Sequence, residues 1–514
     1  MSKTIIIIGA GLAGLSAALQ AAENGCNVKL VSSFPSERAQ SVMAEGGINA
    51  ALNTKDENDS PEEHFTDTIK AACGLADPNA VWGMTQAAPE LVHWLLKLGV
   101  KFNMSGYDDV DLRNFGGQKK KRTAFAQSDT GKQIMTAMID AVRRKEASGM
   151  VERFSHHSFL TLRLCGNICC GCVIRDEYSQ ETVELPGDAV IVATGGMHGL
   201  FGNTTGSLSN TGEVTAELFR LGVPLANGEM IQYHPTTVKC GGKRMLISEA
   251  ARGEGGRLFA MKDGKQWYFM EEKYPELGNL MPRDITAREI WKVSHESEVF
   301  LDMTEISDEI ISNKLSGLAD DCMTYLHKDI RKEPVSVLPG IHYFMGGILV
   351  DEQHRTPIQN LCAAGECCAQ YHGANRLGGN SLLGALYGGR VAAKSACEQA
   401  DVVDLSCATQ IDFPPASQIS EIKQLNKVMQ ETMGVVRNEN TLLNGIQTVQ
   451  ALTGNLPLLG MAVLKSALAR KESRGAHWRE DYPKSNDDDY LKTTVARFDG
   501  KQIQISFVPV PERR

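Results

Sequence analysis

The sequence has few of the features that mark a membrane-bound or secreted protein. No apolar run approaches the ~18 residues of a membrane-spanning helix, and we expect no secretion signal ahead of Thr4. Basic charge is not in excess either, because 53 Lys and Arg stand against 62 Asp and Glu for a net charge of −9. These absences predict a cytoplasmic protein with no nucleic acid among its partners.

The 13 cysteines are an odd number scattered through 514 residues, which is not typical of a disulfide scaffold. The densest group is LCGNICCGCVIRD, where Cys169 and Cys172 have C-x-x-C spacing. The other candidate ligands, Cys165 and Cys170, are crowded into the same short segment. We therefore expect a β-hairpin turning at residues 166–167 and no metal site.

The N-terminal stretch TIIIIGAGLAGLSAALQAAENGCNVKLVSS predicts a nucleotide-binding β-α-β unit. Residues 4–8 form a continuous β-branched run, typical of a strand buried on both faces. Residues 12–23 are helix formers with apolar side chains at helical spacing, and residues 28–31 predict the next strand. The unit places a glycine-rich turn at the start of a helix.

Each glycine of that turn has a separate predicted role. Gly9 permits the tight turn, Gly11 lets the backbone approach a pyrophosphate, and Gly14 allows close packing of helix and strand. The acidic residue that usually follows the second strand and binds a ribose is replaced by Ser32 and then Ser33. This replacement disfavours ordinary NAD binding.

Two further glycine-rich segments belong to the same predicted fold. GDAVIVATGGMHGL is a buried strand that runs into Thr194, Gly195 and Gly196. HGANRLGGNSLLGALYGGRVAAKSA predicts a helix that begins near Asn380 and Ser381. The fold class is therefore α/β.

The chain between and after these segments differs in pattern. Residues 221–340 are mixed in pattern and rich in charge, as expected of an inserted domain. Residues 418–474 are amphipathic and helical, with Pro414 and Pro415 marking the boundary before them.

Several polar residues of the inserted region occur in segments that suggest a functional site. Taken singly, a histidine or arginine is more often structural than functional, and only the joint occurrence changes that interpretation. The segments are QYHPTT, LISEAARGEGG, MPRDITAREI and GIHYFMGGI, which contain His234, Ser248, Glu249, Arg252, Arg283 and His342.

Together with HGANRLGGNSLL, ATGG and RKESRGAHWREDYP, these motifs resemble the flavoprotein subunits of succinate dehydrogenase and fumarate reductase. L-aspartate oxidase is the close relative. The resemblance runs from Thr4 to about Asp489 and implies FAD as the cofactor. It implies a Rossmann-like FAD-binding domain at residues 1–220 and 341–405, interrupted by an inserted α+β capping domain at residues 221–340. A C-terminal helical domain would follow at residues 406–495, and a tail at residues 496–514.

The resemblance also implies a site for a four-carbon dicarboxylate, fumarate or succinate. His342 and Arg376 would hold one carboxylate, and His234, Ser248 and Glu249 the other, with Ser248 standing where threonine is usual. Flavin N5 would deliver hydride to one carbon of fumarate. Arg283 would protonate the neighbouring carbon, and Glu249 and Arg252 would form the relay that reprotonates Arg283.

By the same resemblance, the remaining site residues are assigned to the cofactor and to the substrate. Phe115 and Gly46 would contact the substrate. The cofactor would contact Gly9, Gly11, Gly14, Ser32, Ser33, Gly46, Gly47, Thr194, Gly195, Gly196, Glu213, Glu366, Arg376, Ser381 and Leu382.

Two departures from the family pattern bear on the subfamily. Gln40 occupies the position of the histidine that bonds covalently to FAD in membrane-complex flavoproteins, so FAD should be non-covalent and fumarate reduction favoured. Phe115 stands where L-aspartate oxidase presents an acidic residue to the substrate ammonium. We therefore favour a fumarate reductase flavoprotein subunit, with L-aspartate oxidase as the alternative and a non-catalytic flavin electron-transfer subunit as a further one.

The sequence contains no iron-sulfur motif and no extra haem or flavin domain of its own. A separate electron donor is therefore expected, and the resemblance implies an iron-sulfur subunit. Any attachment to the inner face of the cell membrane would come through partner subunits alone.

Overall fold

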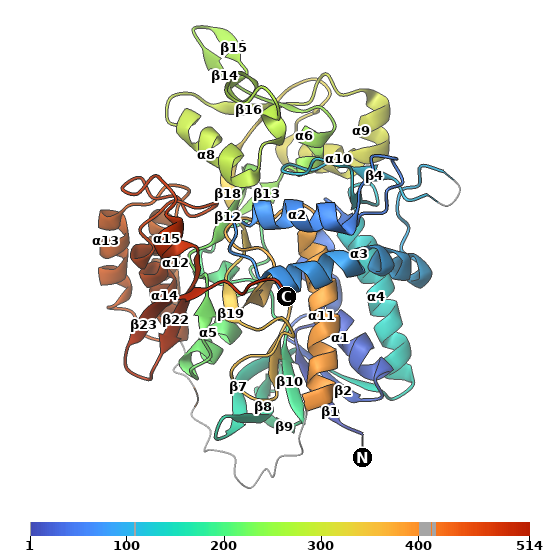
Figure 1. Cartoon of the computed structure of the whole chain (residues 1–514), viewed down its shortest axis with the longest axis vertical. Coiled ribbons are helices and arrows are strands. Elements are labelled where there is room, and N and C mark those ends of the chain that lie inside the picture. The colour runs from blue at the N-terminus through green and yellow to red at the C-terminus, as the bar shows by residue number, and fades with distance from the viewer. Residues whose placement is uncertain (1, 107–108, 400–412, 414–417) are drawn as a thin grey trace.

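The computed structural model describes residues 2–106, 109–399, 413 and 418–514 (Figure 1). Its centre is a parallel five-stranded sheet in the order β20-β10-β1-β2-β6. The strands are β1 (Thr4–Ile8), β2 (Asn27–Ser32), β6 (Val151–Ser155), β10 (Ala189–Val192) and β20 (Leu361–Ala363). The predicted β-α-β unit and the strand before Thr194 are confirmed, and with them the α/β class.

The continuous apolar run of β1 is explained by burial on both faces of this sheet. Ile5 and Ile7 pack among α1 (Leu12–Glu23), α3 (Pro78–Leu98), α4 (Thr130–Ala147) and α11 (Asn380–Gln399). Ile6 and Ile8 face the opposite way, toward an antiparallel sheet of β7 (His157–Cys165), β8 (Ile168–Asp176) and β9 (Thr182–Pro186). Alternation along a strand thus places apolar side chains in two separate cores.

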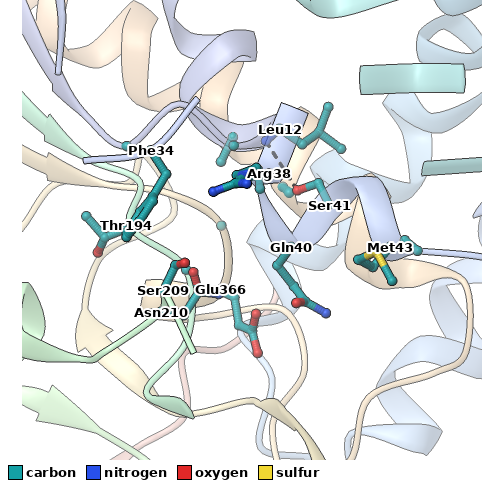
Figure 2. A pocket seen from close by; sticks show the side chains of 18 of the residues that line it. Leu12, Phe34, Arg38, Gln40, Ser41, Met43, Thr194, Ser209, Asn210 and Glu366 are labelled. Carbon is teal, nitrogen blue, oxygen red and sulfur yellow. Dashed lines mark hydrogen bonds between the residues drawn. The ribbon is translucent and has the colours of Figure 1, made fainter. Parts of the chain in front are cut away.

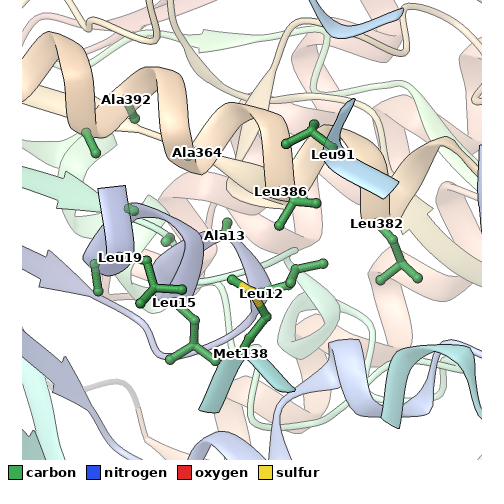
Figure 3. Packing of buried hydrophobic residues seen from close by; sticks show 14 of the residues in the cluster. Leu12, Ala13, Leu15, Leu19, Leu91, Met138, Ala364, Leu382, Leu386 and Ala392 are labelled. Atoms are coloured by element: carbon green, nitrogen blue, oxygen red, sulfur yellow. The ribbon is translucent and has the colours of Figure 1, made fainter. Parts of the chain in front are cut away.

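Helices α1 and α11 lie side by side in the first of these cores (Figure 3). Leu12, Leu15 and Leu19 of α1 meet Leu386 and its neighbours on α11. The backbones approach closely, since Ser16 Oγ donates to the Leu386 carbonyl at 2.7 Å. Helix α11 begins at Asn380, as predicted, so the N-termini of both helices border the same region of the molecule.

The cysteine-rich segment forms the predicted β-hairpin. Cys165 pairs in register with Ile168, so the turn is made by Gly166, at φ 59°, and its neighbour. Cys169 and Cys172 lie inside the hairpin's buried face, and burial raises the pKa of Cys169 to about 12. These side chains therefore act as core residues of the hairpin.

The inserted region combines sheets and helices, which confirms its predicted α+β character. A three-stranded sheet contains β12 (Ile231–Cys240), β13 (Lys243–Leu246) and β18 (Leu338–Phe344), and a four-stranded sheet contains β14 (Arg257–Lys262), β15 (Lys265–Trp267), β16 (Val299–Asp302) and β17 (Val335–Ser336). The expected border at residue 340 lies inside β18. The helices are α6 (Glu249–Gly253), α7 (Phe269–Lys273), α8 (Arg283–Val293), α9 (Asp308–Lys314) and α10 (Ser316–Asp321), followed by the π-helix η5 (Cys322–Leu326).

The C-terminal region begins with the predicted helices and ends in a β-hairpin. The helices are α12 (Ile419–Thr432), α13 (Glu439–Val449), α14 (Asn455–Ala469) and the short α15 (Asp487–Tyr490). Strands β22 (Lys492–Phe498) and β23 (Ile503–Pro509) then extend a sheet through β11 (Leu225–Ala226), β19 (Gly347–Leu349) and β21 (Cys368–Ala369). The expected border at residue 495 lies inside β22, and the boundary at Pro414 and Pro415 lies outside the described residues.

The remaining elements are a small sheet of three short strands, two helices and five 3-10 turns outside the central sheet. They are β3 (Ile48–Asn49), β4 (Leu112–Arg113), β5 (Thr123–Ala124), α2 (Pro61–Ala71), α5 (Glu213–Arg220) and the 3-10 turns η1 (Ser36–Arg38), η2 (Gln40–Met43), η3 (His198–Leu200), η4 (Gly278–Leu280) and η6 (Gly365–Cys367). Within the described ranges, no helix is both long and apolar enough to cross a membrane.

Candidate active site

A cavity of about 1340 Å³ extends from the carboxyl ends of β1 and β2 to the inserted region. Figure 2 shows part of its lining, including Leu12, Gln40 and Thr194. Nearly all of the residues predicted for the cofactor and the substrate line it. The predicted residues that do not line it are Gly14, Gly196 and Arg252, which lie directly behind lining residues. The sequence therefore identified a set of side chains that the fold brings together.

The first turn of the β-α-β unit has the geometry predicted for its glycines. Gly9 adopts φ 111°, and a side chain there would overlap the Ala193 carbonyl. A side chain at Gly14 would overlap the Gly9 carbonyl, so helix and turn pack in direct contact. A Cβ at Gly11 would meet only Ser41 Oγ at 3.7 Å and Ala39 Cβ at 3.8 Å, which leaves its other side open to the cavity.

The N-terminus of α1 offers backbone donors to this part of the cavity. Its N-cap residue, Gly11, makes no side-chain capping hydrogen bond, and Leu12 N donates to Ser41 Oγ over a long 3.3 Å. Ser32 Oγ, at the end of β2, is buried without a hydrogen-bond partner. Backbone N–H groups at a helix N-terminus suit a pyrophosphate, and an unpaired hydroxyl at the strand end suits a ribose, so these residues fit a dinucleotide.

Gln40 lies on η2 and lines the middle of the cavity (Figure 2). Its Oε1 accepts a hydrogen bond of 2.5 Å from Ser207 N. A neutral amide held in this way is not a nucleophile or base toward a bound cofactor.

Arg283, Glu249 and Arg252 form a continuous buried chain of ion pairs. Arg283 Nε and Nη2 both donate to Glu249 Oε2, at 2.9 and 2.6 Å. Arg252 Nη2 donates to the other oxygen, Glu249 Oε1, at 3.2 Å. Burial opposes the charge of Glu249, but the two guanidiniums outweigh it and lower the pKa of this carboxyl. Glu249 is therefore an ionised link between two arginines, of which only Arg283 reaches the cavity.

Two histidines, the buried His234 and the half-buried His342, face each other beside these ion pairs. The rings of His234 and His342 lie 5.2 Å apart in an edge-to-face arrangement. Burial, reinforced by the charge of Arg283, lowers the pKa of both well below its usual value, so both are neutral. His234 Nε2 is buried without a partner, while His342 Nδ1 is hydrogen-bonded to Thr205 Oγ1 at 2.8 Å.

Arg376 approaches the same space from the loop before α11. Its guanidinium lies 4.2 Å from the ring centre of Tyr343, and its Nε has no hydrogen-bond partner. Burial and the nearby charge of Arg283 lower the pKa of Arg376 to about 9. Gln232 connects the two arginines, since its Oε1 accepts from Arg283 Nη1 at 3.1 Å and its Nε2 donates to the Arg376 carbonyl at 2.9 Å.

Phe115 forms an apolar wall of this end of the cavity. A Cβ at Gly46 would lie 2.8 Å from Phe115 Cζ, so the ring occupies the space that a side chain would need. Arg113 fixes both residues, because its Nε and Nη2 donate to the Gly46 carbonyl at 3.0 and 2.5 Å and its guanidinium lies 5.7 Å from the Phe115 ring centre. The site thus combines cationic and neutral donors with one flat apolar surface.

Several residues of the site were not predicted from the sequence. Gln232 lies two residues before His234 in β12, where the period of a strand signals a shared face. Thr205 and Arg113 carry no local signal, because their contacts with His342 and the Gly46 carbonyl join distant parts of the chain. Among the described residues, no group of His, Cys, Asp and Glu has the arrangement of a metal site.

Family models match most of the chain. A model described as FAD binding domain matches residues 4–382, and one described as fumarate reductase flavoprotein C-term matches residues 452–513. The succinate dehydrogenase flavoprotein subunit of Bacillus subtilis is 38% identical over 576 aligned residues, covering 100% of this chain and 98% of the relative. The 8-methylmenaquinol:fumarate reductase flavoprotein subunit of Wolinella succinogenes is 32% identical, covering 100% and 92%.

Solved structures are similar to this chain over nearly its whole length. A quinol fumarate reductase FrdA of E. coli superimposes with a TM-score of 0.90 at 27% identity, covering 99% of this chain and 97% of that one. The Mycobacterium smegmatis Sdh1 structure with UQ1 gives a TM-score of 0.83 at 28% identity, covering 100% and 95%.

Proposed function

The chain belongs to the family of succinate dehydrogenase and fumarate reductase flavoprotein subunits, and from this premise we propose that it is the flavoprotein subunit of a fumarate reductase. As a member of that family, the chain is an FAD-dependent oxidoreductase. The observation that carries the proposal is the convergence of Arg283, Arg376 and the two neutral histidines on one cavity. These groups offer hydrogen-bond donors in a cavity that Phe115 also lines.

Such a donor set suits a short dicarboxylate. Arg376 and His342 would bind one carboxylate of fumarate, and His234 would bind the other through its unpaired Nε2. Ser248 lies at the start of α6 next to Glu249 and completes that side. Phe115 would pack against the alkene, which has no charge to be balanced.

Arg283 is the proposed proton donor. FAD, when bound, supplies the hydride for fumarate reduction. A guanidinium holds its proton too tightly to act as an ordinary acid, but Arg283 shares Glu249 with Arg252. We infer that a proton given up by Arg283 is replaced along this chain, so that no neutral arginine persists.

Gln40 supports non-covalent attachment of FAD. The amide cannot form the bond that a histidine forms at this position in membrane-complex relatives. It is held instead by Ser207 N, within the cavity. In the family, loss of the covalent bond goes with a lower flavin potential, which favours fumarate reduction over succinate oxidation.

The proposed partner is an iron-sulfur electron-transfer subunit. Relatives of this chain are named as flavoprotein subunits, which implies further subunits in those proteins. We propose that the same kind of partner supplies electrons here and provides any attachment to the inner face of the cell membrane.

A dye-coupled assay tests the proposed activity. The purified holoprotein should oxidise a reduced viologen dye only when fumarate is added, and malonate should inhibit competitively. L-aspartate oxidase activity is the alternative, and it requires L-aspartate to reduce the bound flavin. Flavin reduction by L-aspartate at least as fast as by succinate would overturn the proposal, and no turnover with either substrate would favour a non-catalytic electron-transfer subunit.

A further inference from the structure

Thr205 is a polar contact of the site that lies outside the proposed substrate-binding set. Its side-chain oxygen, Oγ1, is 2.8 Å from His342 Nδ1. Its backbone amide donates to the Ile341 carbonyl at 3.0 Å, so the residue is attached to the strand that carries His342 by two bonds. Thr205 therefore has a fixed position relative to the imidazole ring.

The contact between Thr205 and His342 Nδ1 matters because it can decide which nitrogen of a neutral imidazole carries the proton. His342 is half-buried, but desolvation and the nearby charges of Arg283 and Arg376 lower the pKa of its ring well below the usual value, so it does not carry a second proton. A neutral imidazole has one N–H and one lone-pair nitrogen, and the partner of one nitrogen decides which of the two carries the proton. A carboxylate accepts hydrogen bonds only, so His342 can bind one through Nε2 only if the proton is there.

We propose that Thr205 is a positioning residue that holds His342 in the Nε2–H tautomer for dicarboxylate binding. This inference rests on the proposed function. Within the described residues, the Thr205 hydroxyl makes no other hydrogen bond, so its proton is free to be donated to Nδ1. With Nδ1 occupied as an acceptor, the ring presents Nε2–H as its only donor. Thr205 thus acts on the substrate through His342.

The neighbouring residue shows the same arrangement at a second histidine. Thr204 Oγ1 is 3.0 Å from His198 Nδ1 and also accepts from Gly206 N at 3.2 Å. Because that amide already donates to Thr204 Oγ1, the hydroxyl proton is available for His198 Nδ1. Thr204→Val is therefore a matched control, since it removes the same kind of bond from a histidine that does not line the cavity.

A double-mutant cycle tests the inference on the FAD-loaded protein. Thr205→Val keeps the shape of the side chain and removes the donor, so malonate should bind about tenfold more weakly, the loss of one hydrogen bond of ~1.4 kcal/mol. Thr205→Ser should restore binding to within about threefold, and Thr204→Val should leave it unchanged. In a His342→Ala background, Thr205→Val should have no further effect, because no ring remains to be oriented.

The tautomer itself can be observed by nitrogen NMR of protein labelled at its 12 histidines. The His342 signals, assigned from the His342→Ala spectrum, should show a protonated Nε2 in the wild type and in Thr205→Ser, and a mixture of tautomers in Thr205→Val. If the wild-type protein binds malonate and the Thr205→Val variant binds it equally tightly, this inference is overturned and the proposed function still stands. A wild-type protein that neither binds malonate nor reduces fumarate would overturn the proposed function instead.

Discussion

At the scale of single residues, Arg283 and Arg376 have the same side chain in different surroundings. Arg283 is paired on two of its nitrogens with the Glu249 carboxylate, whereas Arg376 has a π contact with Tyr343 and an unpaired Nε. In the proposed scheme the first arrangement connects Arg283 to a source of protons, whereas the second leaves a donor of Arg376 free for a ligand. The two arginines should therefore respond differently to the same substitution.

We expect Arg283→Lys to lower turnover with fumarate by at least the ~10²-fold typical of losing an acid catalyst, with malonate binding largely kept. Arg376→Lys should weaken malonate binding first, because an ammonium cannot reproduce the planar fork of a guanidinium. Steady-state kinetics and calorimetric binding on both variants would measure this. Near-normal turnover in Arg283→Lys would remove Arg283 from the acid role.

Arg288→Lys is the control for these variants. Arg288 lies on α8 with Arg283, but it contacts the Trp478 ring at 4.0 Å and does not line the cavity. Its replacement should change neither turnover nor malonate binding. Equal losses in the Arg288 and Arg283 variants would indicate damage to α8 rather than to the chemistry.

Glu45 gives a prediction on the pH dependence of stability. Its Oε2 is buried without a partner, and burial, with Asp321 adding to it, raises the pKa of this carboxyl to about 8. The native state therefore keeps a proton that the unfolded chain releases above its usual pKa of ~4.3. The free energy of unfolding should fall as pH rises from ~4.3 toward 8, since the native state binds more protons in that range.

Glu45→Gln removes this dependence while keeping the shape of the side chain. The melting temperature of Glu45→Gln minus that of the wild type should be near zero at pH 5 and should increase toward pH 8.5. Thermal denaturation across that pH range would measure it. A constant difference would show that Glu45 does not titrate between these limits.

The sequence predicted which residues would line the site, but not the contacts that set their chemical state. His342 was selected from a short motif, whereas its partner Thr205 lies 137 positions away in the chain. Similarly, the link between Glu249 and Arg283 joins residues 34 positions apart. Local patterns mark residue types and spacing, while protonation depends on neighbours that only the fold supplies.

At the scale of elements, two glycines of the β1–α1 turn serve different purposes. Gly14 is required by the packing of the fold, whereas Gly11 leaves room for a ligand. Gly14 has no room for a side chain even without a cofactor, because a Cβ there would overlap the Gly9 carbonyl. Gly11 has ordinary contacts at 3.7 and 3.8 Å on the protein side and is open on the other. Alanine at these two positions should therefore have different effects.

We expect Gly14→Ala to destabilise the fold by at least the ~1–3 kcal/mol typical of overpacking. Gly11→Ala should leave the melting temperature of the FAD-free protein nearly unchanged but reduce FAD retention, because the new methyl group faces the space where a pyrophosphate would approach. Gly242→Ala is the control, since a Cβ there has no neighbour within 4 Å. Normal FAD retention in Gly11→Ala would contradict the predicted role of this glycine.

Elements were predicted well where one local pattern decides them. Strand β1 and helix α1 follow from an apolar run and a glycine turn, and the β7–β8 hairpin follows from its two-residue turn. Strands β22 and β23 were expected as the end of a helical domain and a tail. The two strands form a local hairpin around Asp499 and Gly500, a turn signal that was not used. Strand β22 then joins the larger sheet by pairing with β11, more than 260 residues earlier in the chain, and this second pairing has no local signal.

At the scale of the whole molecule, the cavity is assembled from segments that are far apart in the sequence. Arg283 comes from the inserted region and Arg376 from the segment that returns to the central sheet. Gln232 bridges them, and Asn375 extends the bridge by donating to Asp284 Oδ1 at 3.0 Å. The inserted region and the sheet domain are therefore coupled through the site itself.

A cofactor that contacts so many segments should stabilise the whole molecule, and the proposed non-covalent attachment would make that stabilisation depend on the cofactor concentration. The cavity is lined from Gly9 near the N-terminus to Leu382 at the start of α11, so unfolding destroys the binding site. Because Gln40 cannot anchor FAD covalently, unfolding should also release it. Free FAD at 100 times its Kd should then raise the free energy of unfolding by ~2.7 kcal/mol, and the melting temperature should rise with FAD concentration.

Two measurements check this prediction on the same sample. Thermal denaturation at increasing free FAD should give a rising melting temperature, and acid precipitation should leave all yellow colour in the supernatant. A Gln40→Ala variant controls for the amide, since removing a group that forms no covalent bond should leave the release complete. Two results together would instead show a covalent link elsewhere in the chain. Flavin fluorescence would stay on the protein in a denaturing gel, and the melting temperature would not change with added FAD.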